Sequence, residues 1–125
     1  MSKILLVENN TDLSEVLSSF LKVSGHEVIT AYDGKQGFNL FKSISFDLVI
    51  TDIIMPKVDG LEMLEMILKL NPKTLVITLS GGHRLVPDVA NQYLEASMKM
   101  GAYFSFRKPF KMNDLLKAID QLTSC

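Results

Sequence analysis

Five short apolar runs recur along the chain, and they limit it to few folds. They are rich in β-branched and aromatic residues and do not alternate cleanly with polar ones: KILLV (3–7), EVITA (27–31), DLVIT (47–51), TLVITL (74–79) and AYFSF (102–106). Strands that are buried on both faces have this pattern, as in a parallel sheet between two layers of helices. The runs therefore predict five parallel strands in one sheet.

Helical patterns lie between these runs. The first and the last carry apolar residues at helical spacing on one stripe, in the sets Leu13, Val16, Leu17, Phe20 and Leu21, and Met112, Leu115, Leu116 and Ile119. The third begins at DGLE (59–62), where Asp59 can cap a helix, and weaker patterns span 35–44 and 86–99. Strands that alternate with helices predict an open α/β sheet with helices on both faces.

The size and charge of the chain exclude several classes of protein. Its 125 residues suffice for one domain, which we expect to span 1–125. The net charge of −1 argues against direct binding of nucleic acid, which needs a clustered excess of basic residues. No apolar stretch approaches the roughly 18 residues of a membrane span. The single cysteine, Cys125, fits a reducing compartment, so we expect a cytoplasmic protein.

Polar residues with complementary chemistry follow four of the predicted strands. They are Glu8 and Asn9 after the first strand, Asp52 after the third, Ser80 after the fourth and Lys108 after the fifth. Right-handed crossovers place the carboxyl ends of parallel strands at one edge, where ligands bind near the point at which the strand order reverses. We therefore expect these acids, the hydroxyl and the cation to form one site.

Each of these residues also has an ordinary structural interpretation. Glu8 and Asn9 can cap the first helix, and Asp52 can cap the turn that follows it. Ser80 precedes two glycines and can belong to a turn, and Lys108 can be a solvated surface lysine. Taken one at a time, these interpretations are favoured, whereas the joint placement of the residues favours a site.

Four segments resemble response-regulator receiver domains, the CheY-like family of two-component signalling. DLVITDIIMPKVDGLEML (47–64) is similar to the phosphoacceptor segment of the family, and GAYFSFRKPF (101–110) to its last strand with a Lys-Pro pair. ILLVENN (4–10) resembles its acidic first strand end, and LVITLSGG (75–82) the strand that carries its Ser or Thr. The resemblance covers the whole chain in the right order. It implies a flavodoxin-like fold, with five parallel strands in the order 2-1-3-4-5 and helices on both faces.

The resemblance also implies a phosphoacceptor function. Asp52 would take a phosphoryl group from a phosphohistidine on a sensor histidine kinase or a His phosphotransfer protein. Lys108 would supply a fixed cation near the acyl phosphate, and the Ser80 hydroxyl would bond to the new phosphoryl oxygen. Drawing Ser80 inward would then shift the surface formed by the fourth helix and the fifth strand. In this role the chain is an acceptor and not an enzyme.

A Mg²⁺ ion is implied in the same way, since this ion prefers hard oxygen ligands. Glu8 would hold it through water, Asp52 directly, and the backbone carbonyl of Ile54 would complete the protein ligands. Asn9 stands where the family usually has a metal-binding Asp, so only its neutral amide oxygen could take part. Two carboxylates, one lysine and Mg²⁺ then sum to +1 instead of zero, which predicts a weakened affinity for the metal.

Ser105 is a second departure, because the family commonly has a switching Tyr or Phe three residues before the lysine. Phe104 and Phe106 flank Ser105 but should point to the other face of the strand. Asn9 and Ser105 together favour an alternative, a pseudoreceiver that binds partner proteins without phosphorylation. A third class, a flavodoxin-like small-molecule binder or enzyme, would need a phosphate-cradling glycine loop or a nucleophile–base pair, and the sequence offers neither.

The resemblance finally implies how a signal leaves the molecule. The chain would act on an effector protein or on a fused output domain. No output domain follows the last helix in this sequence, which suggests either a stand-alone receiver or a part of a larger regulator. A homodimer through the face of the fourth helix, fifth strand and fifth helix is a further expectation.

Overall fold

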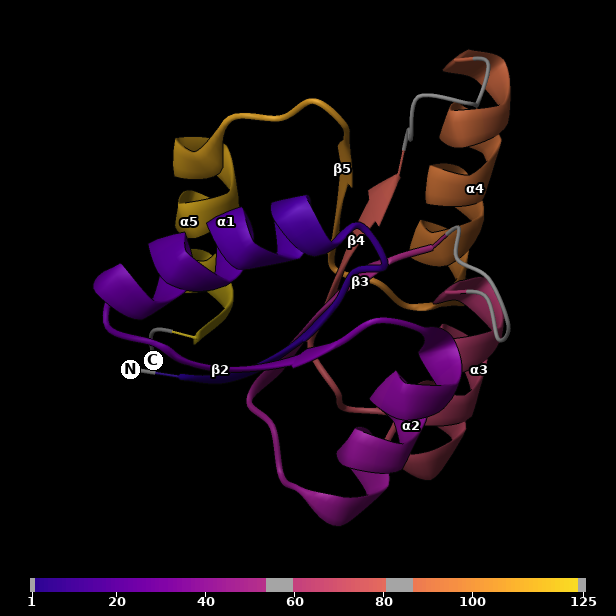
Figure 1. The fold of residues 1–125 in the computed structure, drawn as a ribbon. Coiled ribbons are helices and arrows are strands. Elements are labelled where there is room, and N and C mark those ends of the chain that lie inside the picture. The colour runs from indigo at the N-terminus through magenta and orange to yellow at the C-terminus, as the bar shows by residue number, and fades with distance from the viewer. Residues whose placement is uncertain (1, 54–59, 81–86, 124–125) are drawn as a thin grey trace.

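The computed structural model describes residues 2–53, 60–80 and 87–123, with 87–90 described by their backbone alone. Five strands and five helices alternate within these ranges (Figure 1). The strands are β1 (Lys3–Val7), β2 (Glu27–Ala31), β3 (Leu48–Asp52), β4 (Val76–Ser80) and β5 (Phe104–Arg107). The helices are α1 (Thr11–Val23), α2 (Gly34–Ser43), α3 (Gly60–Leu70), α4 (Pro87–Met100) and α5 (Met112–Thr123).

All five strands are parallel and form one sheet in the order β2-β1-β3-β4-β5. Helices α1 and α5 cover one face of the sheet, and α2, α3 and α4 cover the other (Figure 1). From β1 the chain first moves outward to β2 and then crosses back to β3, so the strand order reverses between β1 and β3. The predicted flavodoxin-like fold with this strand order is confirmed.

Each face of the sheet packs into its own apolar cluster. On one face, alternate residues of β1, β3 and β4 contact α1 and α5, and the cluster includes Ile4, Leu6, Leu17, Leu21, Leu48, Ile50, Ile77, Leu79, Leu115 and Ile119. On the other face, the remaining strand residues pack mainly against α3, in a cluster that includes Leu5, Val7, Val49, Val76, Met63, Leu64 and Ile67. Every residue of β3 and β4 is buried, which explains why the sequence shows continuous apolar runs without alternation.

Three strands begin one or two residues later than their apolar runs predicted, because polar turn contacts hold the first residues of those runs. Asp47 accepts the backbone N–H of Lys3 at 2.8 Å and precedes β3. The Thr74 hydroxyl donates to the backbone oxygen of Asn71 at 2.7 Å and closes the turn before β4. Ala102 donates its N–H to the backbone oxygen of Ser97 at 3.0 Å, in the turn that ends α4.

The helix ends differ from the predicted ranges by one residue. Asp33 caps α2, and its Oδ1 accepts the Gln36 N–H at 2.8 Å, so this helix spans Gly34–Ser43 instead of 35–44. Helix α4 begins at Pro87 instead of residue 86, since the fixed φ of proline suits the first helical position. The predicted cap of α3, Asp59, lies outside the described residues.

Candidate functional site

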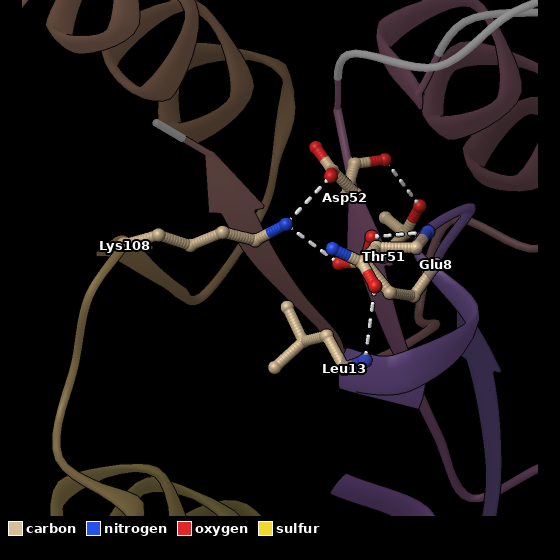
Figure 2. Close-up of polar contacts among 6 residues, drawn as sticks. Glu8, Leu13, Thr51, Asp52 and Lys108 are labelled. Atoms are coloured by element: carbon tan, nitrogen blue, oxygen red, sulfur yellow. Dashed lines mark hydrogen bonds and ion pairs between the residues drawn. The ribbon is translucent and has the colours of Figure 1, made fainter. Parts of the chain in front are cut away.

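Glu8, Asp52 and Lys108 meet at the carboxyl edge of the sheet, and we call this group the acidic pocket. Glu8 directly follows β1, Asp52 ends β3, and Lys108 directly follows β5. The Lys108 Nζ donates to Glu8 Oε1 at 2.7 Å and to Asp52 Oδ2 at 2.8 Å (Figure 2). Residues that are 100 and 56 positions apart in the chain thus form one ion cluster, beside the point where the strand order reverses.

Glu8 lies deepest in this pocket, with no part of the residue exposed to solvent. Its second carboxylate oxygen, Oε2, accepts the backbone N–H of Asn10 at 3.0 Å. Asn10 in turn caps α1, and its Oδ1 accepts the N–H of Leu13 at 3.1 Å (Figure 2). The interpretation of Glu8 and Asn9 as helix caps is therefore wrong, because the next residue is the cap and Asn9 itself is exposed.

Backbone contacts fix the position of Asp52. The Thr51 hydroxyl donates to the backbone oxygen of Asp52 at 2.7 Å (Figure 2). Gly60, the first residue of α3, donates its N–H to the backbone oxygen of Ile53 at 3.1 Å. A Cβ atom at position 60 would overlap the Asp52 carbonyl, so only glycine lets α3 begin directly against the end of β3.

The charges in the pocket shift two pKa values upward. Burial raises the pKa of Glu8, and repulsion by Asp52 raises it further, while the contacts with Lys108 offset part of this rise. Burial alone would lower the pKa of Lys108, but attraction by Asp52 and Glu8 outweighs it, so the pKa of this lysine is raised. The pocket therefore contains a firmly charged lysine and a carboxyl group that ionises reluctantly.

Lys108 is not the solvated surface lysine of the ordinary interpretation. Only 15% of its side chain is exposed, and both carboxylates of the pocket bind its ammonium group. The peptide bond between Lys108 and Pro109 is cis. The backbone N–H of Lys108 also donates to the backbone oxygen of Ser80 at 2.6 Å, which brings the end of β4 next to the lysine.

Ser80 is the last residue of β4 and is fully buried. The interpretation of this residue as part of a turn is therefore wrong. Among the described residues, its Oγ has no hydrogen-bond partner. Buried hydroxyl groups nearly always have one, so this atom calls for an explanation. It can donate a hydrogen to an oxygen atom that enters the edge of the sheet between β3 and β5.

The pocket partly matches the ligand set that the resemblance implies for Mg²⁺. Glu8 and Asp52 offer carboxylate oxygens, and the Lys108 ammonium group bridging them shows that the pair accepts a cation. The described residues hold no cluster of three or more His, Cys, Asp or Glu side chains that could bind a metal ion. The backbone carbonyl of Ile54 lies outside the described residues. Two carboxylates thus fit a divalent ion, with one negative charge fewer than the family pattern.

Sequence reasoning missed a second polar cluster, on the α4 side of β4 and β5. Phe104 and Phe106 pack against the α1 and α5 cluster, as predicted, so Ser105 faces the opposite way. There its Oγ lies 2.7 Å from the hydroxyl of Thr78, which in turn lies 2.7 Å from the Ser97 Oγ. The available signal was a threonine in the middle of a fully buried strand, where an aliphatic residue is expected.

The strand order and the position of the acidic pocket define a flavodoxin-like α/β protein with an acidic site at the carboxyl edge of its sheet. Residues 4–120 match the response regulator receiver domain family. The chain therefore belongs to this family and is a receiver domain of two-component signalling.

Relatives of known sequence and structure agree with this assignment. The chain is 36% identical over 121 residues to a probable transcriptional regulator, ycf29, of Porphyra purpurea, a match that covers 95% of this chain and 55% of the relative. It is 30% identical over 119 residues to the transcriptional regulatory protein CpxR of Escherichia coli (strain K12), covering 95% and 48%. The chain thus spans about half the length of these curated relatives. A crystal structure of a response regulator receiver domain protein from Clostridium thermocellum has a TM-score of 0.86 and 34% identity, covering 98% of this chain and 94% of that chain.

Receiver domains share a metal requirement and types of interaction partner. Receiver domains generally bind Mg²⁺ for phosphorylation, and they interact with histidine kinases and output domains. The comparisons give no support to the pseudoreceiver alternative. None of the helices in the described ranges has the length and apolar character that crossing a membrane requires.

Proposed function

We propose that Asp52 accepts a phosphoryl group from a phosphohistidine on a histidine kinase or a His phosphotransfer protein. The observation that supports this most directly is the contact between Lys108 Nζ and Asp52 Oδ2 at 2.8 Å, beside the buried Glu8. A carboxylate in this position has a fixed cation within reach of any anion that it accepts. Such an arrangement suits an acceptor, because phosphoryl transfer needs positioning and charge neutralisation more than covalent help.

In the transfer step, an oxygen of the Asp52 carboxylate attacks phosphorus. The new O–P bond forms as the P–N bond to the imidazole breaks, and the electron pair of that bond stays on the imidazole nitrogen. Lys108 neutralises part of the negative charge, since its raised pKa keeps the ammonium group protonated at neutral pH. The Ser80 hydroxyl donates to one phosphoryl oxygen, which would give its buried Oγ a partner.

Glu8 and Asp52 are the residues that would hold Mg²⁺, together with the backbone carbonyl of Ile54 and, more weakly, the amide oxygen of Asn9. The bound ion supplies positive charge for the phosphoryl and carboxylate oxygens. The pocket has a net charge of −1 without the ion, from two carboxylates and one lysine. We expect a lower affinity than a third carboxylate at position 9 would give, because each unit of charge a few ångströms from the ion contributes to binding.

The signal is proposed to leave through α4 and β5, toward an effector protein or a fused output domain. Relatives described as transcriptional regulators, about twice as long as this chain, support such an output. Residues 1–125 would form one receiver domain that acts in the cytoplasm, as an acceptor and not as an enzyme, without contacting nucleic acid or membrane itself. A homodimer through α4, β5 and α5 is one form in which this output could act.

The phosphoacceptor role can be tested by incubation with phosphoramidate, a small donor with a P–N bond, in the presence and absence of Mg²⁺. Intact-mass measurement should show one added phosphoryl group that depends on Mg²⁺ and disappears in Asp52→Asn. Asp47→Asn is the matched control, since Asp47 is an exposed acid that precedes β3 at its other end. This variant should take up the group as the wild type does.

Two results would contradict the proposal. One is an unlabelled wild-type protein at saturating donor and Mg²⁺. The other is a labelled Asp52→Asn protein, because the acceptor would then be another residue.

A further inference from the structure

Three hydroxyl groups from three different elements meet between the sheet and α4, and we call Thr78, Ser97 and Ser105 the hydroxyl triad. The Thr78 Oγ1 lies 2.7 Å from both the Ser97 Oγ and the Ser105 Oγ, and the two serine oxygens are 3.1 Å apart. Thr78 and Ser97 are fully buried, and Ser105 is half-buried. Strand β4, helix α4 and strand β5 each contribute one member.

The hydrogen atoms of the triad have few possible arrangements. The Ser97 Oγ donates to the backbone oxygen of Leu94 at 2.7 Å, so it can only accept from the other two hydroxyls. The Ser105 Oγ also lies 3.5 Å from that Leu94 oxygen, a longer contact. Within the triad, Thr78 can donate to Ser97 while Ser105 donates to Thr78, or Ser105 can donate to Ser97 while Thr78 donates to Ser105. Either order uses every hydrogen and ends at the backbone of α4, so the helix can keep its contact while the hydroxyls exchange partners.

Residues 91–100 of α4 bury little apolar surface. Among residues 91–100, only Leu94 and Ser97 are buried. Leu94 is thus the one buried apolar side chain among residues 91–100, whereas the other long helices bury Leu17 and Leu21 in α1, Met63, Leu64 and Ile67 in α3, and Leu115, Ala118 and Ile119 in α5. Hydrogen bonds are directional and fix a position, whereas apolar contact is not directional. The triad thus adds directional contacts between α4 and strands β4 and β5.

The triad and Ser80 occupy the same two strands. Thr78 and Ser80 are two residues apart on β4, so their side chains point to the same face of the sheet. Ser105 is the register partner of Thr78, and the Lys108 N–H donates to the backbone oxygen of Ser80. A surface groove of about 430 Å³ lies beside Ser105, lined by Asn91, Leu94, Glu95, Met98 and Lys99 of α4.

We propose that Thr78, Ser97 and Ser105 are the positioning residues of α4, and that they transmit the phosphorylation signal from Ser80 to this helix in place of an aromatic side chain at position 105. The transmission step rests on the phosphoacceptor function proposed above. When Ser80 turns toward a phosphoryl oxygen, the end of β4 moves with it, and Thr78 changes its partner within the triad. Ser97 then carries the change into the backbone of α4.

Amide hydrogen exchange of residues 91–100 tests the positioning role without phosphorylation. Ser97→Ala should exchange roughly tenfold faster in α4, because Thr78 and the Leu94 carbonyl each lose a partner. Ser43→Ala is the matched control, since the exposed Ser43 hydroxyl donates at 3.1 Å to the backbone oxygen of Asn39 in its own helix. Exchange of α4 in this control should equal that of the wild type. Thr78→Ser, which retains a hydroxyl, should stay close to the wild type, whereas Thr78→Val should behave like Ser97→Ala.

The same proteins labelled with phosphoramidate and Mg²⁺ test the transmission step. Labelling should change exchange in α4 of the wild type and of Ser43→Ala, and should change it several-fold less in Ser97→Ala. Equal responses in all three proteins would overturn transmission, and equal exchange in the unlabelled proteins would overturn the positioning role. If the wild type takes up no phosphoryl group, the phosphoacceptor function and the transmission step fail together, while the unlabelled proteins still decide whether the triad positions α4.

Discussion

Two clusters of three polar side chains are buried against the same sheet, and they differ in charge. In the acidic pocket, Lys108 binds both Glu8 and Asp52. In the hydroxyl triad, the neutral hydroxyl groups of Thr78, Ser97 and Ser105 are hydrogen-bonded to one another. In the pocket Lys108 contacts both acids, whereas in the triad each hydroxyl oxygen lies within 3.1 Å of both others.

This difference separates a site that accepts an outside group from a contact that holds the fold. The pocket has one negative charge in excess, and burial raises the pKa of Glu8, so a further cation would stabilise it. The triad is neutral, and each of its hydrogens has an acceptor, so it gains nothing from a ligand. We therefore expect phosphoryl transfer at the acidic pocket, and we expect the hydroxyl triad to couple a movement of β4 to α4.

Lys108→Met should have the largest effect, because it leaves two buried carboxylates without their cation. Removing one partner of a buried ion pair destabilises a protein by roughly 3 kcal/mol at neutral pH. Urea unfolding without divalent ions measures this loss. Lys3→Met is the control: the Lys3–Glu27 pair, at 3.3 Å, is exposed, so its loss should change stability by less than about 1 kcal/mol.

The loss in Lys108→Met should also depend on pH. The raised pKa of Glu8 means that the folded protein binds this proton more tightly than the unfolded chain, so stability falls as pH rises from 4.5 through the raised value. Without Lys108, which lowers the pKa of Glu8, this fall should be steeper and extend to higher pH. The difference from the wild type should shrink again above the ordinary lysine value of 10.5, as pH rises through the raised pKa of Lys108. A loss that is the same at acid and neutral pH would show that Lys108 does not lower the pKa of Glu8.

Thr78→Val tests the hydroxyl triad at the residue that makes its two shortest contacts. Valine keeps the shape of threonine but removes the oxygen that contacts both serines at 2.7 Å, so the cost should be about 2 kcal/mol, the penalty for leaving buried groups without a partner. Unlike the loss in Lys108→Met, this loss should be the same across the acid and neutral range, since no member of the triad titrates there. A pH-dependent loss would mean that the two clusters are coupled through the end of β4.

The sequence predicted the acidic pocket well and the hydroxyl triad poorly, for physical reasons. Glu8, Asp52 and Lys108 each follow or end a buried strand, and parallel topology brings such positions to one edge. Charged residues are conspicuous there because they are rarely buried. The ordinary interpretation of Lys108 was wrong because it ignored the two acids 100 and 56 residues away.

Serine and threonine give a weaker signal, because they occur both inside proteins and on surfaces. Ser97 lies on a helix whose apolar pattern is weak, and nothing in the sequence shows that it faces β4. The sequence marks Ser105 only as a departure from the family pattern and does not indicate its partners. The strand starts of β3, β4 and β5 were placed too early because side-chain and turn hydrogen bonds, which apolar patterns do not report, hold the preceding residues.

Asn9→Asp should raise the affinity of the acidic pocket for Mg²⁺. A third carboxylate near Glu8 and Asp52 should raise Mg²⁺ affinity on the order of tenfold, because one more negative charge acts on the ion. Titration with Mg²⁺, followed through the amide signals of Glu8 and Asn10, gives the affinity. Asn10→Asp is the control, since it adds the same charge at the cap of α1, where its oxygen is bound to the Leu13 N–H. Equal gains in both variants would mean that position 9 does not contact the ion.

Ser105→Ala should have the smallest effect, because it removes an outer member of the triad. Thr78 and Ser97 still contact each other at 2.7 Å, and the Ser97 hydroxyl still donates to Leu94. The loss of stability in urea unfolding should therefore stay below about 1 kcal/mol, less than half of that in Thr78→Val. Solvent can also reach the half-buried position 105 and replace the lost partner.

A loss in Ser105→Ala as large as that in Thr78→Val would show that the three hydroxyls act as one indivisible unit. The triad could then not exchange partners while holding α4, because any change in pairing would break all of it. A small loss instead means that the Ser97 hydroxyl keeps its contact with Leu94 of α4 while Thr78 can exchange partners within the triad.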